Sequence, residues 1–375
     1  MIKLDHLTKA FETDAGTTLA ADRISFEVAD GEICVLLGPS GCGKTTTLKM
    51  INRLVEPTSG KIYIDGKDTD DYDPVELRRT IGYVIQQIGL FPNMTVEENI
   101  CVVPKLLGWD MNRARARAAE LMAIINLEPA IFLKRYPKEL SGGQQQRVGV
   151  ARALAADPPV LLMDEPFGAI DPINREVIQD EFLKIHRRLK KTVMFVSHDI
   201  DEAVKMADKV AVFRAGKLEQ FDSPDHLLAH PVNDFIADFV GTDRTLKRLR
   251  LVKVQSALHS EVARVAPQDK LDRAASLMHE TDSEFIVMVD ELGRPQGYVA
   301  RGVYKGQEGT AAEFGARLPA TVRIDEDLRT AVSKMFMYDV PWLTCVDHDG
   351  VFAGVITQRG VTRLLGETYR DHPKT

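Results

Sequence analysis

One glycine-rich segment limits the possible folds of this chain more than any other feature. Residues 38–45 read Gly-Pro-Ser-Gly-Cys-Gly-Lys-Thr, follow the apolar run 33–37, and precede a helix expected from about Lys44 to Arg53. The pattern GxxxxGK[ST] between a strand and a helix is typical of a loop whose backbone N–H groups cradle phosphate oxygens. The positive N-terminal end of the following helix points at the same anion. We therefore expect a strand–loop–helix unit that binds phosphate groups.

The residue types in this loop predict its contacts with a nucleotide. Lys44 has the reach to contact β- and γ-phosphates, and the Thr45 hydroxyl suits a Mg²⁺ ion. The residues expected to bind the nucleotide here are Gly38, Ser40, Gly41, Cys42, Gly43, Lys44, Thr45 and Thr46. ATP and Mg²⁺ are the expected cofactors.

Two carboxylates follow a second apolar run, at 160–163. Ligands in such folds lie at the carboxyl ends of the strands, which is where Asp164 and Glu165 stand. We expect Asp164 to join Thr45 in the Mg²⁺ shell, and Glu165 to orient the attacking water or accept its proton. The alternative, an acidic helix cap, loses weight because the phosphate loop is present.

The first half of the chain alternates short apolar runs with helical stretches. The runs 33–37, 160–163 and 192–196 are continuously apolar, which is typical of strands in a sheet covered on both faces. Residues from about 95 to 156 are almost wholly helical in pattern and are expected to form an inserted helical subdomain. The fold class expected for this half is α/β, that of a P-loop NTPase.

Composition excludes some classes of protein. The 375 residues carry a formal net charge of −7, which argues against a general nucleic-acid binder, so no nucleic-acid partner is expected. The four cysteines form no CxxC pair, so no zinc site or disulfide framework is indicated. No apolar run reaches the roughly 18 residues that a spanning helix needs. If the protein serves a membrane, separate subunits must form the channel.

The C-terminal part contains an internal repeat. Val-Asp-Glu-Leu-Gly at 289–293 matches Val-Asp-His-Asp-Gly at 346–350, an offset of 57 residues. The same offset relates several apolar and glycine positions on either side. Each unit is predicted to contain a helix, a strand, a turn, a strand and a helix. One unit is too small to bury its sheet well, so the two are expected to pack together.

A third motif points to a particular family. Residues 140–147 read Leu-Ser-Gly-Gly-Gln-Gln-Gln-Arg and resemble the signature motif of ABC ATPases. A polar loop in which Ser141 caps a helix is the plainer interpretation, and both can hold. The resemblance implies that Ser141, Gly142 and Gly143 bind the γ-phosphate of ATP held by the partner subunit. It therefore implies a homodimer of nucleotide-binding domains with ATP between them.

Other positions match this family in the expected order. Gln86, with Gln87 beside it as the alternative, resembles the glutamine that lies near Mg²⁺ and the membrane subunits. Asp171 resembles the aspartate of the D-loop, and His198 the switch histidine that contacts the γ-phosphate. Phe11 stands where the family stacks an aromatic ring on adenine, although an isolated Phe is more often a core residue. By this resemblance Glu165, His198 and Gln86 are catalytic, and Gln86 also joins the metal shell.

The resemblance covers roughly residues 1–240 and implies a RecA-like core with the inserted helical subdomain. The repeated C-terminal units resemble a tandem CBS pair, an α+β module. The expected domains are therefore a nucleotide-binding domain at 1–240, a linker at 241–254, a first CBS repeat at 255–314 and a second at 315–372.

The CBS resemblance leaves two roles open, regulation by a nucleotide and plain dimerisation. Adenosine-binding CBS domains often place an Asp three residues after a Thr or Ser. Here Thr357 is followed by Gly360, and the first repeat has Ala300 and Val303, so ordinary AMP or ATP binding is disfavoured. A cyclic dinucleotide at the repeat interface stays open through family likeness.

An ABC ATPase with tandem CBS repeats is similar to the ATPases of quaternary-amine osmoprotectant importers. The resemblance implies ATP-driven uptake of solutes such as glycine betaine, choline or carnitine. It implies transmembrane permease subunits as partners, an extracytoplasmic substrate-binding protein as an indirect one, and a place on the cytoplasmic face of the membrane. Two alternatives remain: an importer ATPase for another small solute, and a soluble ABC ATPase that acts outside transport.

Overall fold

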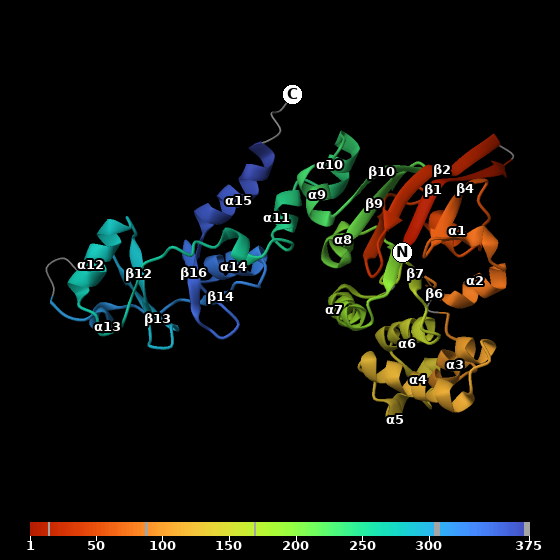
Figure 1. The fold of residues 1–375 in the computed structure, drawn as a ribbon, viewed down its shortest axis with the longest axis horizontal. Helices are drawn as coiled ribbons and strands as arrows, with labels where there is room; N and C mark the ends of the chain where they lie inside the picture. Colours follow the sequence, from red (N-terminus) through yellow and green to blue (C-terminus); the bar gives the residue numbers. More distant parts are fainter. Residues whose placement is uncertain (14–15, 87–88, 169, 304–307, 371–375) are drawn as a thin grey trace. The chain divides into compact units, whose positions relative to one another are not determined.

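The computed structural model describes residues 1–13, 16–86, 89–168, 170–303 and 308–370. It divides into two compact units, Met1–Gly241 and Thr242–Thr375. Each unit is built around its own sheets (Figure 1).

The first unit contains a largely parallel sheet with the strand order β10-β9-β3-β8-β7-β6, in which only β10 runs antiparallel to its neighbour. Its strands are β3 (Ile33–Leu37), β6 (Ile81–Val84), β7 (Val160–Asp164), β8 (Thr192–Val196), β9 (Lys209–Arg214) and β10 (Lys217–Asp222). β3, β7 and β8 are buried along their whole length, which confirms the strands predicted from the continuous apolar runs.

A second, antiparallel sheet has the order β2-β1-β4-β5. Its strands are β1 (Ile2–Thr13), β2 (Gly16–Val28), β4 (Ser59–Ile64) and β5 (Lys67–Asp68). One face of this sheet, including Leu4 and Phe26, shares a hydrophobic core with Leu36 and Leu162 of the parallel sheet. Burial of this shared core fixes the position of the phosphate loop, because the loop leaves the parallel sheet directly after β3.

Helices cover the parallel sheet and form a separate helical region. The helices of the first unit are α1 (Lys44–Ile51), η1 (Thr69–Asp71), α2 (Pro74–Thr80), α3 (Val96–Leu106), α4 (Met111–Ile124), α5 (Pro129–Phe132), η2 (Pro137–Glu139), α6 (Gly142–Leu154), α7 (Pro172–Leu189), α8 (Ile200–Met206), α9 (Pro224–Ala229) and α10 (Asp234–Val240). α3 to α6 lie together at the end of the unit away from the antiparallel sheet (Figure 1). None of the helices in the described ranges combines the length and apolar character that crossing a bilayer requires.

The second unit consists of two similar halves. The elements of the first half are β11 (Arg264–Val265), α12 (Leu271–Glu280), β12 (Phe285–Val289), β13 (Pro295–Ala300) and α13 (Ala311–Phe314). Those of the second half are β14 (Thr321–Arg323), α14 (Leu328–Met337), β15 (Trp342–Val346), β16 (Phe352–Thr357) and α15 (Gln358–Arg370). Each half forms a three-stranded sheet with a short parallel strand at one edge. The sequence pattern missed this edge strand in both halves, because two or three residues carry no periodic signal.

The turn inside each half repeats the same pair of backbone-to-carboxylate hydrogen bonds. The Asp290 carboxylate accepts hydrogen bonds from the N–H groups of Leu292 and Arg294, and Asp347 accepts them from Asp349 and Val351. Gly293 and Gly350 follow with φ of 75° and 79°, a conformation that favours glycine. The repeated letters of the sequence therefore encode a repeated turn.

The segment expected as a linker, 241–254, is folded in the structure. It holds α11 (Arg244–Arg248) and the start of η3 (Val254–Ala257). Leu249 and Val254 are buried in the core of the second half of this unit. The basic stretch that suggested a connector is thus anchored to the core of the second unit by these two apolar residues.

Candidate functional site

The phosphate loop joins β3 to α1, and its glycines are required by its conformation. Gly38 and Gly43 have φ of 142° and 102°, values that residues with a Cβ rarely adopt. A Cβ at Gly43 would lie 1.9 Å from the Ala20 carbonyl oxygen, and one at Gly38 would lie 2.3 Å from that of Phe213. Other residues at these two positions would clash with neighbouring backbone, so the loop conformation requires glycine there.

Lys44 is buried, and its ammonium group is held by the loop itself. Nζ donates to the carbonyl oxygens of Gly38 and Pro39 at 2.7 and 2.8 Å. The Cys42 side chain is buried in the core beneath the loop, with Sγ 3.6 Å from Lys44 Nζ, and its backbone N–H donates to the Pro39 carbonyl oxygen at 3.4 Å. Ser40 is exposed at the tip, and Thr46 is half-buried in the first turn of α1.

Thr45 and Asp164 meet at the mouth of the loop. The Thr45 hydroxyl donates to Asp164 Oδ1 at 3.0 Å, which brings the start of α1 against the end of β7. Burial raises the pKa of the Asp164 carboxyl above its usual value, and the Thr45 hydrogen bond opposes that shift. A buried carboxylate with one neutral donor is electrostatically unfavourable, so the pair is suited to a cation.

Two other predicted site residues, Gln86 and His198, lie against Glu165. Gln86 Nε2 donates to Glu165 Oε2 at 2.9 Å, and His198 Nδ1 lies 3.9 Å from the same oxygen. Glu165 adopts φ of 43°, an unusual conformation for a residue with a side chain and one found at functional sites. Gln87, the alternative to Gln86, lies outside the described residues.

The signature segment begins α6. Ser141 caps the helix, accepting from the Gln144 N–H at 3.3 Å, and Gln144 Oε1 accepts from the Ser141 N–H at 2.9 Å. A Cβ at Gly142 would meet no atom within 4 Å, whereas one at Gly143 would lie 2.8 Å from Ile178 Cδ1. The exposed N-terminus of a helix of this length is a favourable place for an anion.

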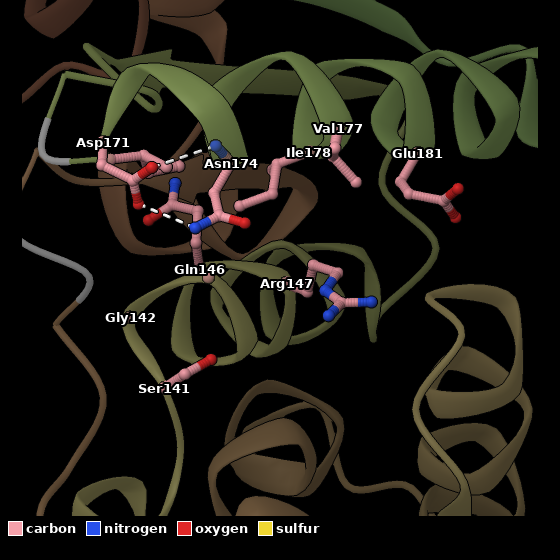
Figure 2. A pocket seen from close by; sticks show the side chains of 11 residues that line it. Ser141, Gly142, Gln146, Arg147, Asp171, Asn174, Val177, Ile178 and Glu181 are labelled. Atoms are coloured by element: carbon pink, nitrogen blue, oxygen red, sulfur yellow. Dashed lines mark hydrogen bonds between the residues drawn. The ribbon is translucent and has the colours of Figure 1, made fainter.

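A cavity of about 300 Å³ lies between this helix and α7. Figure 2 shows Ser141 and Gln146 of α6 on one side and Asp171 and Asn174 on the other. Asp171 caps α7, with Asn174 N and Nδ2 donating to its two carboxylate oxygens at 3.1 and 2.9 Å. Within the described part of the chain, Nε2 of the buried Gln146 has no hydrogen-bond partner. The described residues that line this cavity include none from the phosphate loop.

Phe11 lies on the surface of the first unit, on the hairpin of β1 and β2. Its side chain is 40% exposed, and Lys9 Nζ lies 4.9 Å from its ring centroid. The ordinary expectation that a lone Phe belongs to the core is therefore wrong at this position. A ring face held at the surface beside a cation is available for stacking.

Sequence reasoning missed a buried polar network behind His198. It consists of Ser197, Glu202, Gln179 and Arg175, which come from β8 and its following loop, α8 and α7. Each is an ordinary residue in its local sequence, and only the fold brings them together. No spacing rule in the sequence pointed to them.

The arrangement described so far defines a class of protein. A phosphate loop, a Thr–Asp pair, a glutamate between Gln and His, and a helix-capping Ser-Gly-Gly segment form the site of an ABC-type ATPase. The ABC transporter family model matches residues 21–168. The dimeric ATP-binding cassette MJ0796 bound to ADP and Pi matches with 36% identity and a TM-score of 0.53, over 60% of this chain and 99% of that one. The cbiO1 protein of Clostridium perfringens matches with 27% identity and a TM-score of 0.56, over 61% and 90%.

Two relatives of this chain match it over nearly its whole length. The osmoprotectant import ATP-binding protein OsmV of Salmonella typhimurium is 55% identical, over 99% of this chain and 98% of its own. The glycine betaine/carnitine/choline transport ATP-binding protein OpuCA of Bacillus subtilis is 43% identical, over 97% and 96%. The chain belongs to the ABC transporter family as an ATP-binding subunit, and it is an ATPase. Because these alignments extend past residue 241, the relatives share its C-terminal unit as well.

Proposed function

We propose that this chain is the ATP-hydrolysing subunit of an importer for quaternary-amine osmoprotectants such as glycine betaine, choline and carnitine. The full-length similarity to OsmV and OpuCA supports this class of solute, because OsmV is named for osmoprotectant import and OpuCA for glycine betaine, carnitine and choline transport. In this proposal residues 1–240 are the motor, and 255–314 and 315–372 form a tandem CBS module behind a connecting segment at 241–254.

The convergence of Gln86 and His198 on Glu165 carries the proposal for hydrolysis. A carboxylate oxygen that accepts from Gln86 at 2.9 Å and lies 3.9 Å from His198 Nδ1 is fixed in direction. We assign Glu165 to orient the attacking water and accept its proton, and His198 to contact the γ-phosphate. Lys44 exchanges its two carbonyl partners for phosphate oxygens when ATP enters the loop. Phe11 offers its exposed ring to adenine.

The donors around Thr45 fit a Mg²⁺ ion. A hydroxyl and a carboxylate are hard oxygen ligands, and Mg²⁺ usually takes few protein ligands and completes its shell with water and phosphate oxygens. Thr45 and Asp164 would hold the ion, with Gln86 beside it. The ion supplies charge neutralisation at the β- and γ-phosphates.

A homodimer completes the site in this proposal. The Ser141–Gly143 segment presents an open helix end and lines a cavity that the phosphate loop does not reach, so its anion has to come from elsewhere. The ATP held by a second copy supplies that anion, and Asp171 lies on the same surface. The dimeric cassette found among the structural matches supports this arrangement.

The helical region offers a surface for the permease. A groove of about 630 Å³ lies between α3, α4 and the loop before α3. Met94 and Met111 give it apolar sides, and Glu97, Lys105 and Arg115 give it charges of both signs. A short amphipathic segment of a transmembrane subunit fits such a groove, which would hold this chain peripherally on the cytoplasmic face. An extracytoplasmic substrate-binding protein takes part only indirectly, on the far side of the permease.

The CBS module has a site suited to a regulatory nucleotide. A hollow of about 650 Å³ in the second unit is lined by Tyr298 and Trp342, by Thr357 and by Arg359. Rings offer stacking, a hydroxyl offers hydrogen bonds and a guanidinium pairs with phosphate. We propose a cyclic dinucleotide rather than AMP, with plain dimerisation as the alternative. Calorimetry of the full chain with cyclic di-AMP and AMP tests this, and absence of heat with both would favour dimerisation.

The variant Glu165→Gln tests the motor. It keeps the shape of the side chain and removes the base, so ATP binding should persist while hydrolysis falls by roughly 10²-fold or more. Gln220→Ala, at a buried polar position away from the site, is the control. Wild-type turnover by Glu165→Gln would refute the assignment of Glu165. Loss of betaine, choline and carnitine uptake in salt-stressed cells that lack this subunit tests the solute class separately.

A further inference from the structure

Glu202, in α8, is a buried carboxylate that the proposed mechanism does not use. Its side chain is 6% exposed, and it accepts from Ser197 Oγ at 2.7 Å and from Gln179 Nε2 at 3.2 Å. Arg175 Nε lies 4.0 Å from Glu202 Oε1, the oxygen that accepts from Gln179. Burying a carboxylate costs free energy unless its hydrogen bonds and its charge are satisfied. The groups that Glu202 contacts therefore indicate which parts of the structure it holds in place.

On one side, Glu202 fixes the turn that carries His198. The Ser197 hydroxyl donates to Glu202 and accepts from the Asp199 N–H at 3.0 Å, so one side chain fastens both sides of His198. The Ser197 N–H in turn donates to the Leu36 carbonyl at 3.0 Å, in the strand that enters the phosphate loop. The His198 ring itself is 61% exposed. Packing therefore holds the ring only in part, and its place relative to Glu165 depends on where the backbone of the turn stands.

On the other side, Arg175 connects this turn to the segment before α7. Arg175 Nη1 lies 3.7 Å from Asp199 Oδ2, and Nη2 donates to the Ile170 carbonyl at 3.0 Å. Ile170 and Asp171 line the cavity beside the signature segment. One guanidinium thus contacts both the histidine turn and the edge of the surface proposed to face the second copy.

We propose that Glu202 and Arg175 are positioning residues for hydrolysis, which hold His198 in place relative to the Ile170–Asp171 segment. The inference rests on the proposed function and adds residues that touch neither nucleotide nor metal. They act through His198: the network sets where its backbone stands, and the segment before α7 is one of the anchors. The competing account is a polar network that only stabilises the packing of α7 against α8.

The test compares hydrolysis and ATP binding in the purified full chain. Glu202→Ala removes the acceptor of Ser197, and a shift of the reacting groups by about 1 Å can cost 10²-fold. We expect its kcat to fall by about 10- to 100-fold with the KM for ATP changed by less than about threefold, because the phosphate loop is untouched. Glu202→Gln keeps an acceptor and loses the charge that faces Arg175, so its loss should be smaller. If the alanine variant folds poorly, Glu202→Gln still tests the inference.

A double-mutant cycle separates positioning from general stability. If Glu202 acts through His198, then adding Glu202→Ala to His198→Ala should lower the residual single-turnover rate by less than about threefold, since coupled residues are non-additive. Arg175→Met combined with Glu202→Ala should likewise lose less than the product of the single effects.

The matched control is Gln220→Ala. Gln220 is also a buried polar residue of the first unit, with hydrogen bonds to the His230 carbonyl at 3.1 Å and from the Val232 N–H at 3.2 Å. The kcat of Gln220→Ala should stay within about twofold of the wild-type value, even though its melting temperature should fall about as much as that of Glu202→Ala. Multiplicative losses in the cycle, or equal losses of kcat in Glu202→Ala and Gln220→Ala, would overturn the inference. A wild-type chain that does not hydrolyse ATP would overturn the proposed function together with it.

Discussion

Gly142 offers a sharp test of the dimer, because a methyl group there harms nothing within one chain. A Cβ at this position would meet no atom within 4 Å, and no left-handed φ is required. Gly142 is the first residue of α6, so alanine should lower the cost of fixing the backbone. If the Ser-Gly-Gly segment closes on the ATP of a second copy, the methyl group obstructs only that contact.

The structure allows the size of both effects to be worked out. Alanine is favoured over glycine by about 1 kcal/mol in a helix interior and by less in the first turn. For a unit of this size, that is a rise in melting temperature of at most about 2–4 °C. Loss of one backbone donor to a phosphate oxygen costs about 10²- to 10³-fold in rate. Gly142→Ala should therefore be at least as stable as the wild type and at least about 10²-fold slower in ATP hydrolysis.

The assays are thermal unfolding without nucleotide, ATP turnover, and size-exclusion chromatography with ATP in the Glu165→Gln background, where slow hydrolysis should trap the proposed dimer. Gly366→Ala is the matched control, since a Cβ there also meets no atom within 4 Å and the glycine is helical. It should keep wild-type turnover. Wild-type turnover and a normal trapped dimer in Gly142→Ala would refute the proposal that this segment contacts nucleotide.

Two further predictions concern Asp164 and Trp342. Burial raises the pKa of Asp164, so whatever stability it contributes is present below the carboxyl's unfolded value and is lost as pH rises through the folded value. Asp164→Asn should therefore melt at a higher temperature than the wild type at pH 8 without nucleotide, match it near pH 4, and hydrolyse no ATP; a lower melting temperature at pH 8 would contradict this. The Trp342 ring stacks on Phe285, centroids 3.7 Å apart, between the two halves of the second unit. Trp342→Ala should cost that unit about 3–5 kcal/mol and leave basal ATP hydrolysis unchanged, and a lost ATPase activity would show that the two units do not fold independently.

The sequence was sufficient for the parts of the fold that need rare backbone conformations or long patterns. At Gly38 and Gly43, a positive φ and nearby carbonyl oxygens exclude residues other than glycine, so the phosphate loop could be predicted from its sequence pattern. The continuous apolar runs became β3, β7 and β8 for the same kind of reason, burial on both faces. In both cases, one short stretch of chain contains the whole physical requirement.

Features that depend on distant residues were not readable. The short strands β11 and β14 exist because β12 and β15 present free edges, not because their own residues prefer a strand. The segment expected as a linker folds because Leu249 and Val254 find a core made elsewhere. Glu202 is an ordinary helical glutamate until the fold places Ser197 and Gln179 against it. Local sequence gave no signal for any of these.

One side of the site has its contacts made within a single chain and the other side is open, and Arg175 connects the two. On the phosphate-loop side, Thr45 meets Asp164 and Gln86 meets Glu165 within one chain. On the α6–α7 side, a helix end is open and Ile170 borders a cavity. Arg175 donates to the Ile170 carbonyl and lies against Asp199 in the histidine turn. Filling the cavity with a second copy's nucleotide therefore constrains the same segment that anchors His198. Hydrolysis would then depend on closure through the Arg175 guanidinium, by its hydrogen bond to Ile170 and its ion pair with Asp199, rather than through a change in the phosphate loop.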